Sequence, residues 1–260
     1  MTTFVVQTHN LWGDAWQQER AGALRALYEV RPPDLLATQE LRGWSRDALD
    51  ETMAHHARVV DEFAGWERQS NLWWDSRLFE EVEHGAEDVG ILDENARLFW
   101  VRLRVKRGGA TLILSTAHLT WPGHAVEQGD GVNLRVPQAQ RIVTCLDAIG
   151  DEGEAVFFTV DINDIAGPLW AFGNAGFLDS FSALGRHSPV THPVIPSGFS
   201  DGVGTRLSPL ASPAKAIDWV YARGPVRPRA SEVVEFFHRG VAPSDHYPVA
   251  ATFTLDDGQF

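Results

Sequence analysis

The chain is poor in cysteine, in basic residues and in long apolar runs. Its single cysteine, Cys145, excludes an intrachain disulfide and a cysteine-type zinc site, so any bound metal must be held by oxygen or imidazole ligands. The first residues lack a basic segment followed by a long apolar stretch, and no apolar run approaches the length that spans a membrane. We therefore expect a cytoplasmic protein.

Acidic residues outnumber basic ones, with 35 Asp and Glu against 22 Lys and Arg and a formal net charge of -13. Nucleic-acid binding depends mainly on cations that neutralise phosphates, and a chain this acidic has no obvious basic stripe. The charge therefore favours a small substrate over a nucleic acid. It does not exclude a nucleic acid, because a bound metal ion can make a cleft locally positive in an acidic protein.

The length of 260 residues and the hydrophobic content of 44% fit one large domain with a substantial core. No repeat, low-complexity segment or linker divides the sequence, so residues 1–260 are predicted to form a single domain. Strand patterns outnumber helix patterns and the two are mixed along the chain. This indicates an α/β protein whose sheets pack on each other with helices outside.

The N-terminal region predicts a β-α-β unit. Phe4–Thr8 and Leu35–Thr38 are apolar runs typical of buried strands. The amphipathic helix between them is predicted to be capped by Asp14 and ended by Pro32 and Pro33. A unit of this length makes its two strands parallel.

A further apolar pattern predicts one more helix, over Val136–Leu146. Residues 119–137 and 181–215 are rich in Gly, Pro, Ser and His with little periodicity, which predicts two long loops. Loops of that length in a compact domain are usually functional, so we expect them to influence substrate choice. The first two of the remaining strand candidates form a hairpin around Arg107–Gly109. These candidates are Phe99–Lys106, Thr111–Thr116, Val156–Val160, Ala216–Tyr221, Val233–Phe237 and Val249–Phe253.

Polar side chains stand where the predicted strands end. Asn10, Glu40, His118, Asp161 and Asn163 each follow an apolar strand, and Asp245 and His246 precede the last one. If the last strand is antiparallel to the others, all of them meet at one edge. Carboxylates gathered there would repel one another unless a cation joined them. Oxygen ligands beside a phosphate favour Mg²⁺, with Mn²⁺ or Ca²⁺ as substitutes.

Six short blocks carry these residues: Thr8–Trp12, Gln39–Glu40, Ala117–Leu119, Val160–Asn163, Ile217–Val220 and Ser244–Pro248. In order and spacing they resemble the signature blocks of the endonuclease/exonuclease/phosphatase (DNase I-like) superfamily, and the resemblance covers nearly the whole chain. It implies a four-layer α/β sandwich, with two mixed sheets face to face and helices on both outer faces. It also implies a Mg²⁺-dependent hydrolase that acts on phosphoric ester bonds by in-line attack of water.

The resemblance assigns a role to each matching residue. Asn10, Glu40 and Asp245 would help to bind the metal. Asp161 would orient or deprotonate the attacking water, and Asn163 would assist it and hold a phosphate oxygen.

The imidazoles have separate roles in this scheme. Asp218 would hydrogen-bond His246, which fixes the tautomer of the ring and supports its charged form. His118 would contact the phosphate, and whether it also protonates the leaving oxygen stays open. Two positions depart from the family pattern, because Val160 stands in place of Gly and Ala117 in place of Thr.

Structural readings compete with these roles. Glu67 is a weak counterpart of the glutamate that pairs with the third-block histidine in some nucleases of the family. Asp218 could serve a neighbouring donor in a purely structural way. Asn163 could simply cap the turn after its strand.

Four residues are candidates for contacts to substrate. Trp12 and Trp121 could form a stacking wall for a base or an apolar group, and ordinary packing is the alternative. His192 and Arg206 lie in the second long loop, which also contains the cation Lys215, and solvated side chains are the alternative there. The histidines expected in solvent are His55, His56, His84 and His238.

Three functions remain open. The favoured one is hydrolysis of a small-molecule or lipid-headgroup phosphodiester or phosphomonoester, and the alternative is a DNA or RNA endonuclease or exonuclease. A catalytically inactive binding module of the same fold is the third, although all eight matching positions are filled. The number of metals, the oligomeric state and any protein partner stay open.

Overall fold

The computed structural model describes residues 1–194 and 214–256. Within them, six strands form the first sheet, in which β1 is parallel to β2 and antiparallel to β12. Their order across the sheet is β11 (Val226–Val233), β12 (Val249–Leu255), β1 (Thr2–Asn10), β2 (Leu35–Gln39), β4 (Leu72–Asp75) and β3 (His56–Arg58).

The described residues contribute six strands to the second sheet as well. In it β7 is parallel to β8, and β10 is antiparallel to β8. Their order is β5 (Phe79–Glu87), β6 (Leu98–Val105), β7 (Thr111–His118), β8 (Ala155–Asp161), β10 (Asp218–Arg223) and β9 (Leu178–Asp179).

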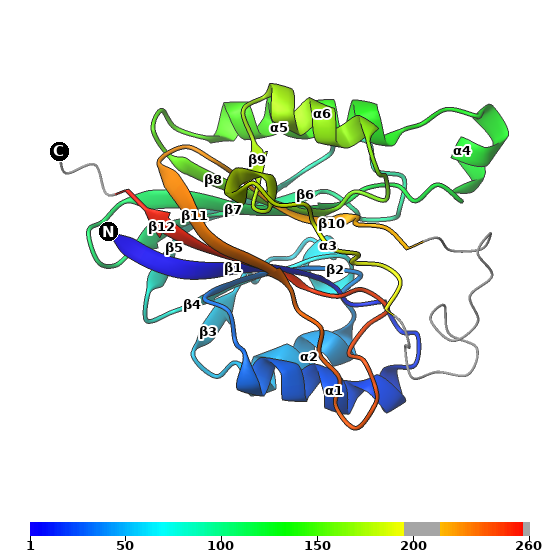
Figure 1. The fold of residues 1–260 in the computed structure, drawn as a ribbon, viewed down its shortest axis with the longest axis horizontal. Coiled ribbons are helices and arrows are strands. Elements are labelled where there is room, and N and C mark those ends of the chain that lie inside the picture. Colours follow the sequence, from blue (N-terminus) through cyan, green and yellow to red (C-terminus); the bar gives the residue numbers. More distant parts are fainter. Residues whose placement is uncertain (195–213, 257–260) are drawn as a thin grey trace.

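Helices cover the two outer faces. Figure 1 shows α1 and α2 below the first sheet and α5 and α6 above the second, which is the expected four-layer α/β sandwich. None of the described helices is both long and apolar enough to cross a membrane. The helices are α1 (Gln17–Val30), α2 (Gly43–Thr52), α3 (Gly65–Arg68), α4 (Ala125–Asp130), α5 (Arg135–Ile149), α6 (Gly167–Asn174) and the 3₁₀ helix η1 (Ser182–Leu184).

The inner faces of the sheets close on an apolar core. Strand β1 shows how the alternation of side chains divides the layers, because Phe4 and Val6 point into this core and Val5 packs towards the helices. Aromatic rings from both sheets meet edge to face there, with Phe157 5.6 Å from Phe4 and 5.0 Å from Phe253 between ring centroids. Contacts of this kind hold the two sheets in a fixed register.

One edge of the sandwich collects the strand ends that carry the sequence blocks. The C-terminal ends of β1, β2, β7 and β8 lie there together with the N-terminal ends of β10 and β12. The predicted parallel β-α-β unit, the hairpin of β6 with β7, and the antiparallel last strand are confirmed. Polar residues that end these strands therefore face one region.

Three predictions about local structure are wrong. Helix α1 begins at Gln17 and its N-cap is Trp16 rather than Asp14, because residues 13–16 form a turn first. The strand expected over Val233–Phe237 lies earlier, as β11, because Val234 leaves the sheet to pack into the core beneath α1 and α2. The loop expected over residues 119–137 contains α4 and the start of α5.

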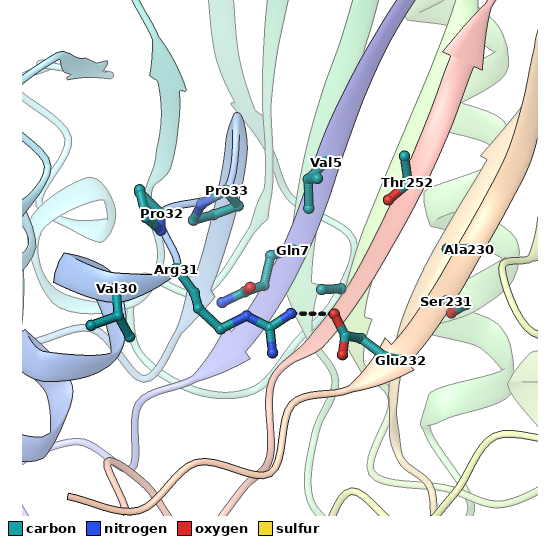
Figure 2. Close-up of a pocket in the computed structure, with 11 residues that line it drawn as sticks. Val5, Gln7, Val30, Arg31, Pro32, Pro33, Ala230, Ser231, Glu232 and Thr252 are labelled. Carbon is teal, nitrogen blue, oxygen red and sulfur yellow. Dashed lines mark hydrogen bonds and ion pairs between the residues drawn. The ribbon is translucent and has the colours of Figure 1, made fainter.

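Beyond the C-terminal end of α1, the outer face of the first sheet is hollowed by a pocket of about 550 Å³. Figure 2 shows Arg31 reaching across it to an ion pair with Glu232 on β11, with Gln7 of β1 also in the lining. The lining of this pocket has no residue in common with the cavity at the sheet edge. It is therefore a separate feature of the molecule.

Candidate active site

A cavity of about 620 Å³ opens at the edge where the strand ends meet. Its lining includes nine of the residues named from the sequence: Trp12, Glu40, His118, Trp121, Asp161, Asn163, His192, Asp245 and His246. Asn10 and Asp218 lie directly behind this lining, each hydrogen-bonded to a member of it. Arg206 lies outside the described residues. The structure thus brings together every described residue of the predicted site, and their roles stay predictions.

Asn10 joins the carboxylates of the two sheets. Its Nδ2 donates to Oε1 of Glu40 over 3.1 Å and to Oδ2 of Asp161 over 3.0 Å. Its Oδ1 accepts the backbone N–H of Trp12 over 2.9 Å. Because Asn10 is only 1% exposed, these bonds hold two like charges side by side with little screening by solvent.

Three residues of the site have left-handed backbone conformations directly after strands. These are Trp12 after β1, Glu40 after β2 and Asn163 after β8, with φ angles of 58°, 52° and 48°. Side-chain-bearing residues pay about 1 kcal/mol or more for this conformation, so the surroundings must enforce it. Two hydrogen bonds hold Asn163 in this conformation. Its N–H donates to Oδ1 of Asp161, and its Nδ2 donates to the carbonyl of Leu119.

Gln39 fixes the spacing of the sheets beneath the cavity. Its Nε2 donates to Oγ1 of Thr8 on β1 over 2.9 Å and to Oγ1 of Thr116 on β7 over 2.7 Å. All three side chains are buried, so these bonds are shielded from competing water. The block residue next to Glu40 is therefore structural, which the sequence pattern did not distinguish.

His118 lies beside the Asp161 turn. Its Nε2 is 2.9 Å from Nδ2 of Asn163 and 3.5 Å from Oδ2 of Asp161. An amide nitrogen can only donate, so Nε2 of His118 is the acceptor in this contact. His118 and Asn163 are therefore placed as a pair on one wall of the cavity.

Asp218 and His246 form the predicted hydrogen-bonded pair. Nδ1 of His246 lies 2.9 and 3.1 Å from the two carboxylate oxygens of Asp218, which the sheet register places opposite Asp161. Burial alone would lower the pKa of His246, but the nearby charges of Asp218, Asp245 and Asp161 outweigh it and raise the pKa to about 10. The ring is an imidazolium at neutral pH, with Nε2 turned towards the other two carboxylates.

The donor set at the cavity fits a hard divalent cation. Glu40 and Asp245 supply carboxylate oxygens, the ligand type that Mg²⁺ prefers. Burial acts to raise the pKa of Asp245, but His246, His192 and Arg20 outweigh burial and lower the pKa, so the carboxylate is ionised. Five carboxylates gather here in all, those of Glu40, Asp93, Asp161, Asp218 and Asp245, which makes added positive charge favourable.

Comparison of structures finds the same arrangement of elements in known proteins. TDP2 from D. rerio, complexed with a single-strand DNA product, matches with a TM-score of 0.77 and 18% identity, over 98% of this chain and 100% of that chain. A mannosyl-6-phosphatase from Bacteroides thetaiotaomicron matches with a TM-score of 0.74 and 15% identity, over 97% and 100%. The fold is that of the endonuclease/exonuclease/phosphatase superfamily.

A third structure carries this family name in its own description. It is an endonuclease/exonuclease/phosphatase family protein from Bacteroides thetaiotaomicron, with a TM-score of 0.73 and 16% identity over 98% of each chain. Comparison by sequence finds no family model and no curated protein that matches. The likeness is therefore one of fold.

Arg20 supports the cavity from behind, and no sequence block contains it. The guanidinium is fully buried in α1 and donates to four backbone carbonyls, those of Trp12, Gly13, Ala15 and Pro243. Burial is the main reason why its pKa is lowered to about 10. A signal was present, because helical spacing places position 20 on the same face as the apolar residues at 24 and 27.

Thr191 is a second supporting residue that the sequence did not reveal. Its Oγ1 accepts the backbone N–H groups of Ile217 and Asp218 over 3.0 and 3.2 Å, and its carbonyl accepts that of Tyr247. It is fully buried and so ties the start of β10 to the segment that carries His246. No periodic pattern surrounds it in the sequence, and only the fold brings its partners together.

Proposed function

We propose that this protein is a divalent-metal-dependent phosphoesterase that hydrolyses a small phosphate ester by in-line attack of water. The observation that carries the proposal is the convergence on one cavity of Glu40, Asp161, Asp245 and the Asp218–His246 pair. The fold, which the TDP2 and mannosyl-6-phosphatase structures share, supports the same reaction class.

Glu40 and Asp245, together with Asn10, would hold a Mg²⁺ ion, for which Mn²⁺ or Ca²⁺ could substitute. An ion bound there supplies positive charge to the phosphoryl oxygens and to the leaving oxygen. Asn10 also keeps Glu40 and Asp161 apart at a fixed distance, so that one carboxylate serves binding and the other stays available for a proton.

Asp161 would accept the proton of the attacking water. It is 1% exposed, and Asn10 and the N–H of Asn163 orient its two oxygens. His118 and Asn163, which lie beside Asp161, would bind phosphate oxygens. The imidazolium of His246, held by Asp218, would stabilise the charge that develops on phosphorus-bound oxygens.

The charge of the cavity favours a small substrate. Apart from imidazoles, its described basic residues are Arg42 and Lys215, against the acids Glu40, Asp93, Asp161 and Asp245. Binding of a long nucleic acid needs a cation for each of several phosphates. A volume of about 620 Å³ also suits a compact ligand.

A nuclease that acts near a strand end is the second candidate. Trp12 and Trp121 both line the cavity, and Trp121 is 52% exposed, so its ring is available to stack on a base. Stacking would add affinity that the few cations do not supply. This candidate therefore depends on the tryptophans rather than on a basic surface.

The test is turnover of phosphomonoesters, phosphodiesters, single-stranded oligonucleotides and plasmid DNA, after chelation and after return of Mg²⁺. We expect D161N and H246A to lower kcat by about 10²- to 10⁴-fold on the best substrate, with an unchanged circular dichroism spectrum. The matched control is E29Q, which removes an exposed carboxylate on α1. Wild-type rates in both site variants, or full activity without a divalent ion, contradict the proposal.

The same panel separates the two candidates. Turnover of a small ester while nucleic acids stay intact at low salt supports the small-substrate reading. Cleavage of oligonucleotides supports the nuclease. W121A should then weaken the cleavage, and changes to the charge of remote surface residues should not affect it.

A further inference from the structure

Two imidazoles and a carboxylate meet on one side of the cavity. Nε2 of His192 lies 3.6 Å from Oδ2 of Asp245, and Nε2 of His246 lies 3.9 Å from Oδ1 of the same residue. The two rings lie 4.4 Å apart between centroids, at an angle of 42°. One potential ligand atom from each residue falls within 4.8 Å of the others.

These distances suit a small ion with bonds to nitrogen and oxygen. Zn²⁺ binds such ligands at about 2.0–2.1 Å, which places ligand atoms of a tetrahedron about 3.4 Å apart. The separations of 3.6 and 3.9 Å run to the two different oxygens of Asp245, and one ligand atom from each residue lies within 4.8 Å of the others. Small side-chain rotations would therefore bring all three residues into bonding range.

The surroundings of both imidazoles prepare them as ligands. Asp218 accepts from Nδ1 of His246, which leaves Nε2 directed at the cavity, the arrangement by which a carboxylate orients a metal-binding histidine. For His192, Nδ1 has no hydrogen-bond partner among the described residues, and Nε2 is too far from Asp245 for a good hydrogen bond. Ligation of an ion through Nε2 would give that nitrogen a bond that Asp245 does not provide at this distance.

The backbone holds His192 in place. Its own N–H and carbonyl pair with Lys215, and the next residues are tied to the His246 segment by Val194 N–H donating to the carbonyl of Asp245 over 2.8 Å. On its other side, Thr191 accepts the N–H of Tyr247 over 2.8 Å. His192 is thus clamped against Asp245 and His246 by main-chain bonds, so little entropy is lost when an ion binds.

We propose that His192, Asp245 and His246 form a three-ligand site for a transition-metal ion, best fitted by Zn²⁺, with a fourth position open to the cavity. Two imidazole donors select Zn²⁺ over Mg²⁺, whose preferred ligands are oxygens. The site shares Asp245 with the oxygen ligands proposed for Mg²⁺, and it takes up Nε2 of His246, which must release its proton to solvent before it can bind the ion. Zn²⁺ bound there therefore competes with the Mg²⁺-dependent reaction.

Direct binding tests the site without any substrate. Metal-free protein titrated with Zn²⁺ in a calorimeter should bind one ion at this site, and H192A should lose at least tenfold in affinity. H192C, which keeps a zinc-ligating side chain, should restore binding. The matched control H187A removes an exposed histidine of the same segment and should bind Zn²⁺ as the wild type does.

A measurement on the wild-type protein tests the same site without depending on whether the variants fold. Nuclear magnetic resonance signals of the His192 and His246 rings should shift together on addition of Zn²⁺, with the signal of His187 unchanged. Equal Zn²⁺ affinity in wild type and H192A, or ring shifts at His187 alone, overturns the proposal. Since none of these readouts involves catalysis, the site can fail while the proposed phosphoesterase activity holds, and the reverse.

Discussion

The guanidinium of Arg20 donates to the backbone carbonyl of Pro243, 223 positions away in the sequence, over 2.8 Å. The same side chain reaches the carbonyls of Trp12 and Gly13, so it binds the loop after β1 to the loop before β12. One loop contains a wall of the cavity and the other leads directly to Asp245. Arg20 thereby couples two loops that must keep their spacing for the proposed metal ligands to converge.

Replacement of Arg20 should damage both stability and activity. R20M leaves buried carbonyls without donors, each at a cost of about 1–3 kcal/mol, so we expect the free energy of unfolding to fall by at least about 2 kcal/mol. R20K should recover only part of this loss, because one ammonium cannot reach four carbonyls in the geometry of a guanidinium. Urea unfolding and kcat on the best substrate measure the two effects.

The control for Arg20 lies on the same helix. Arg25 forms an exposed ion pair with Glu51, and such pairs contribute about 0–1 kcal/mol. R25M should therefore unfold close to the wild-type urea concentration and keep its turnover. If R20M and R25M lose the same amount of stability and turnover, the effect comes from any substitution in α1, and Arg20 has no specific role.

The site could be located from sequence because its residues follow simple strand patterns. The strands β1, β2, β7 and β8 are apolar runs with polar residues at their ends, and parallel strands end on the same side. By contrast, β5 (FEEVEHGAE) and β11 (VRPRASEV) are polar edge strands whose pairing depends on their neighbours. Their positions could not be predicted from periodicity.

Contacts between distant segments explain why the sequence patterns did not predict the environments of several other residues. The roles of Arg20 and Thr191 depend on partners at Pro243 and Asp218, which only the folded chain brings near. His84, expected in solvent, instead lies on β5 between two carboxylates. Single side chains of this kind follow no sequence pattern, because tertiary neighbours decide their environment.

Thr191 should anchor the Asp218–His246 pair through its hydroxyl. T191V keeps the shape of the side chain but leaves the N–H groups of Ile217 and Asp218 without an acceptor, so we expect a loss of about 1–3 kcal/mol in unfolding free energy and a lower kcat. T191S, which keeps the hydroxyl, should restore most of the activity. The control T144V removes an exposed hydroxyl on α5. If T191V and T191S behave alike, the hydroxyl has no such role.

His84 provides a pH-dependent contribution to stability. Burial lowers its pKa, but hydrogen bonds with Glu81 and Asp61 outweigh burial and raise the pKa above the ordinary value of 6.5. A raised pKa in the folded state means that this stabilisation is fully present below pH 6.5. It is lost as the pH rises through the folded-state pKa.

Nuclear magnetic resonance titration of the His84 ring checks this prediction. Its midpoint should lie above 6.5 in the wild type and fall in E81Q, which removes the nearer acceptor, 2.6 Å from Nδ1. E80Q changes an exposed carboxylate on the same strand that pairs with Arg104 instead, and should leave the midpoint where it is. If the titration midpoint of His84 is the same in E81Q as in the wild type, groups other than Glu81 raise the pKa of His84.

Gly123 controls where the indole of Trp121 stands at the mouth of the cavity. A Cβ at position 123 would come within 1.7 Å of Trp121 Cζ3, so G123A must displace the ring. Because Trp121 is 52% exposed, the displacement should cost little stability. If the ring contacts substrate, KM should rise about fivefold, the equivalent of about 1 kcal/mol of lost stacking, while kcat changes less.

A double-mutant cycle separates a contact to substrate from ordinary packing. W121A and G123A should each raise KM, and the double variant should be no worse than W121A alone, because both changes remove the same contact. G129A is the control, since its Cβ would meet nothing within 4 Å on α4. Additive effects of W121A and G123A would mean that Gly123 acts on another part of the cavity. A wild-type KM in both single variants would mean that Trp121 only packs at the rim.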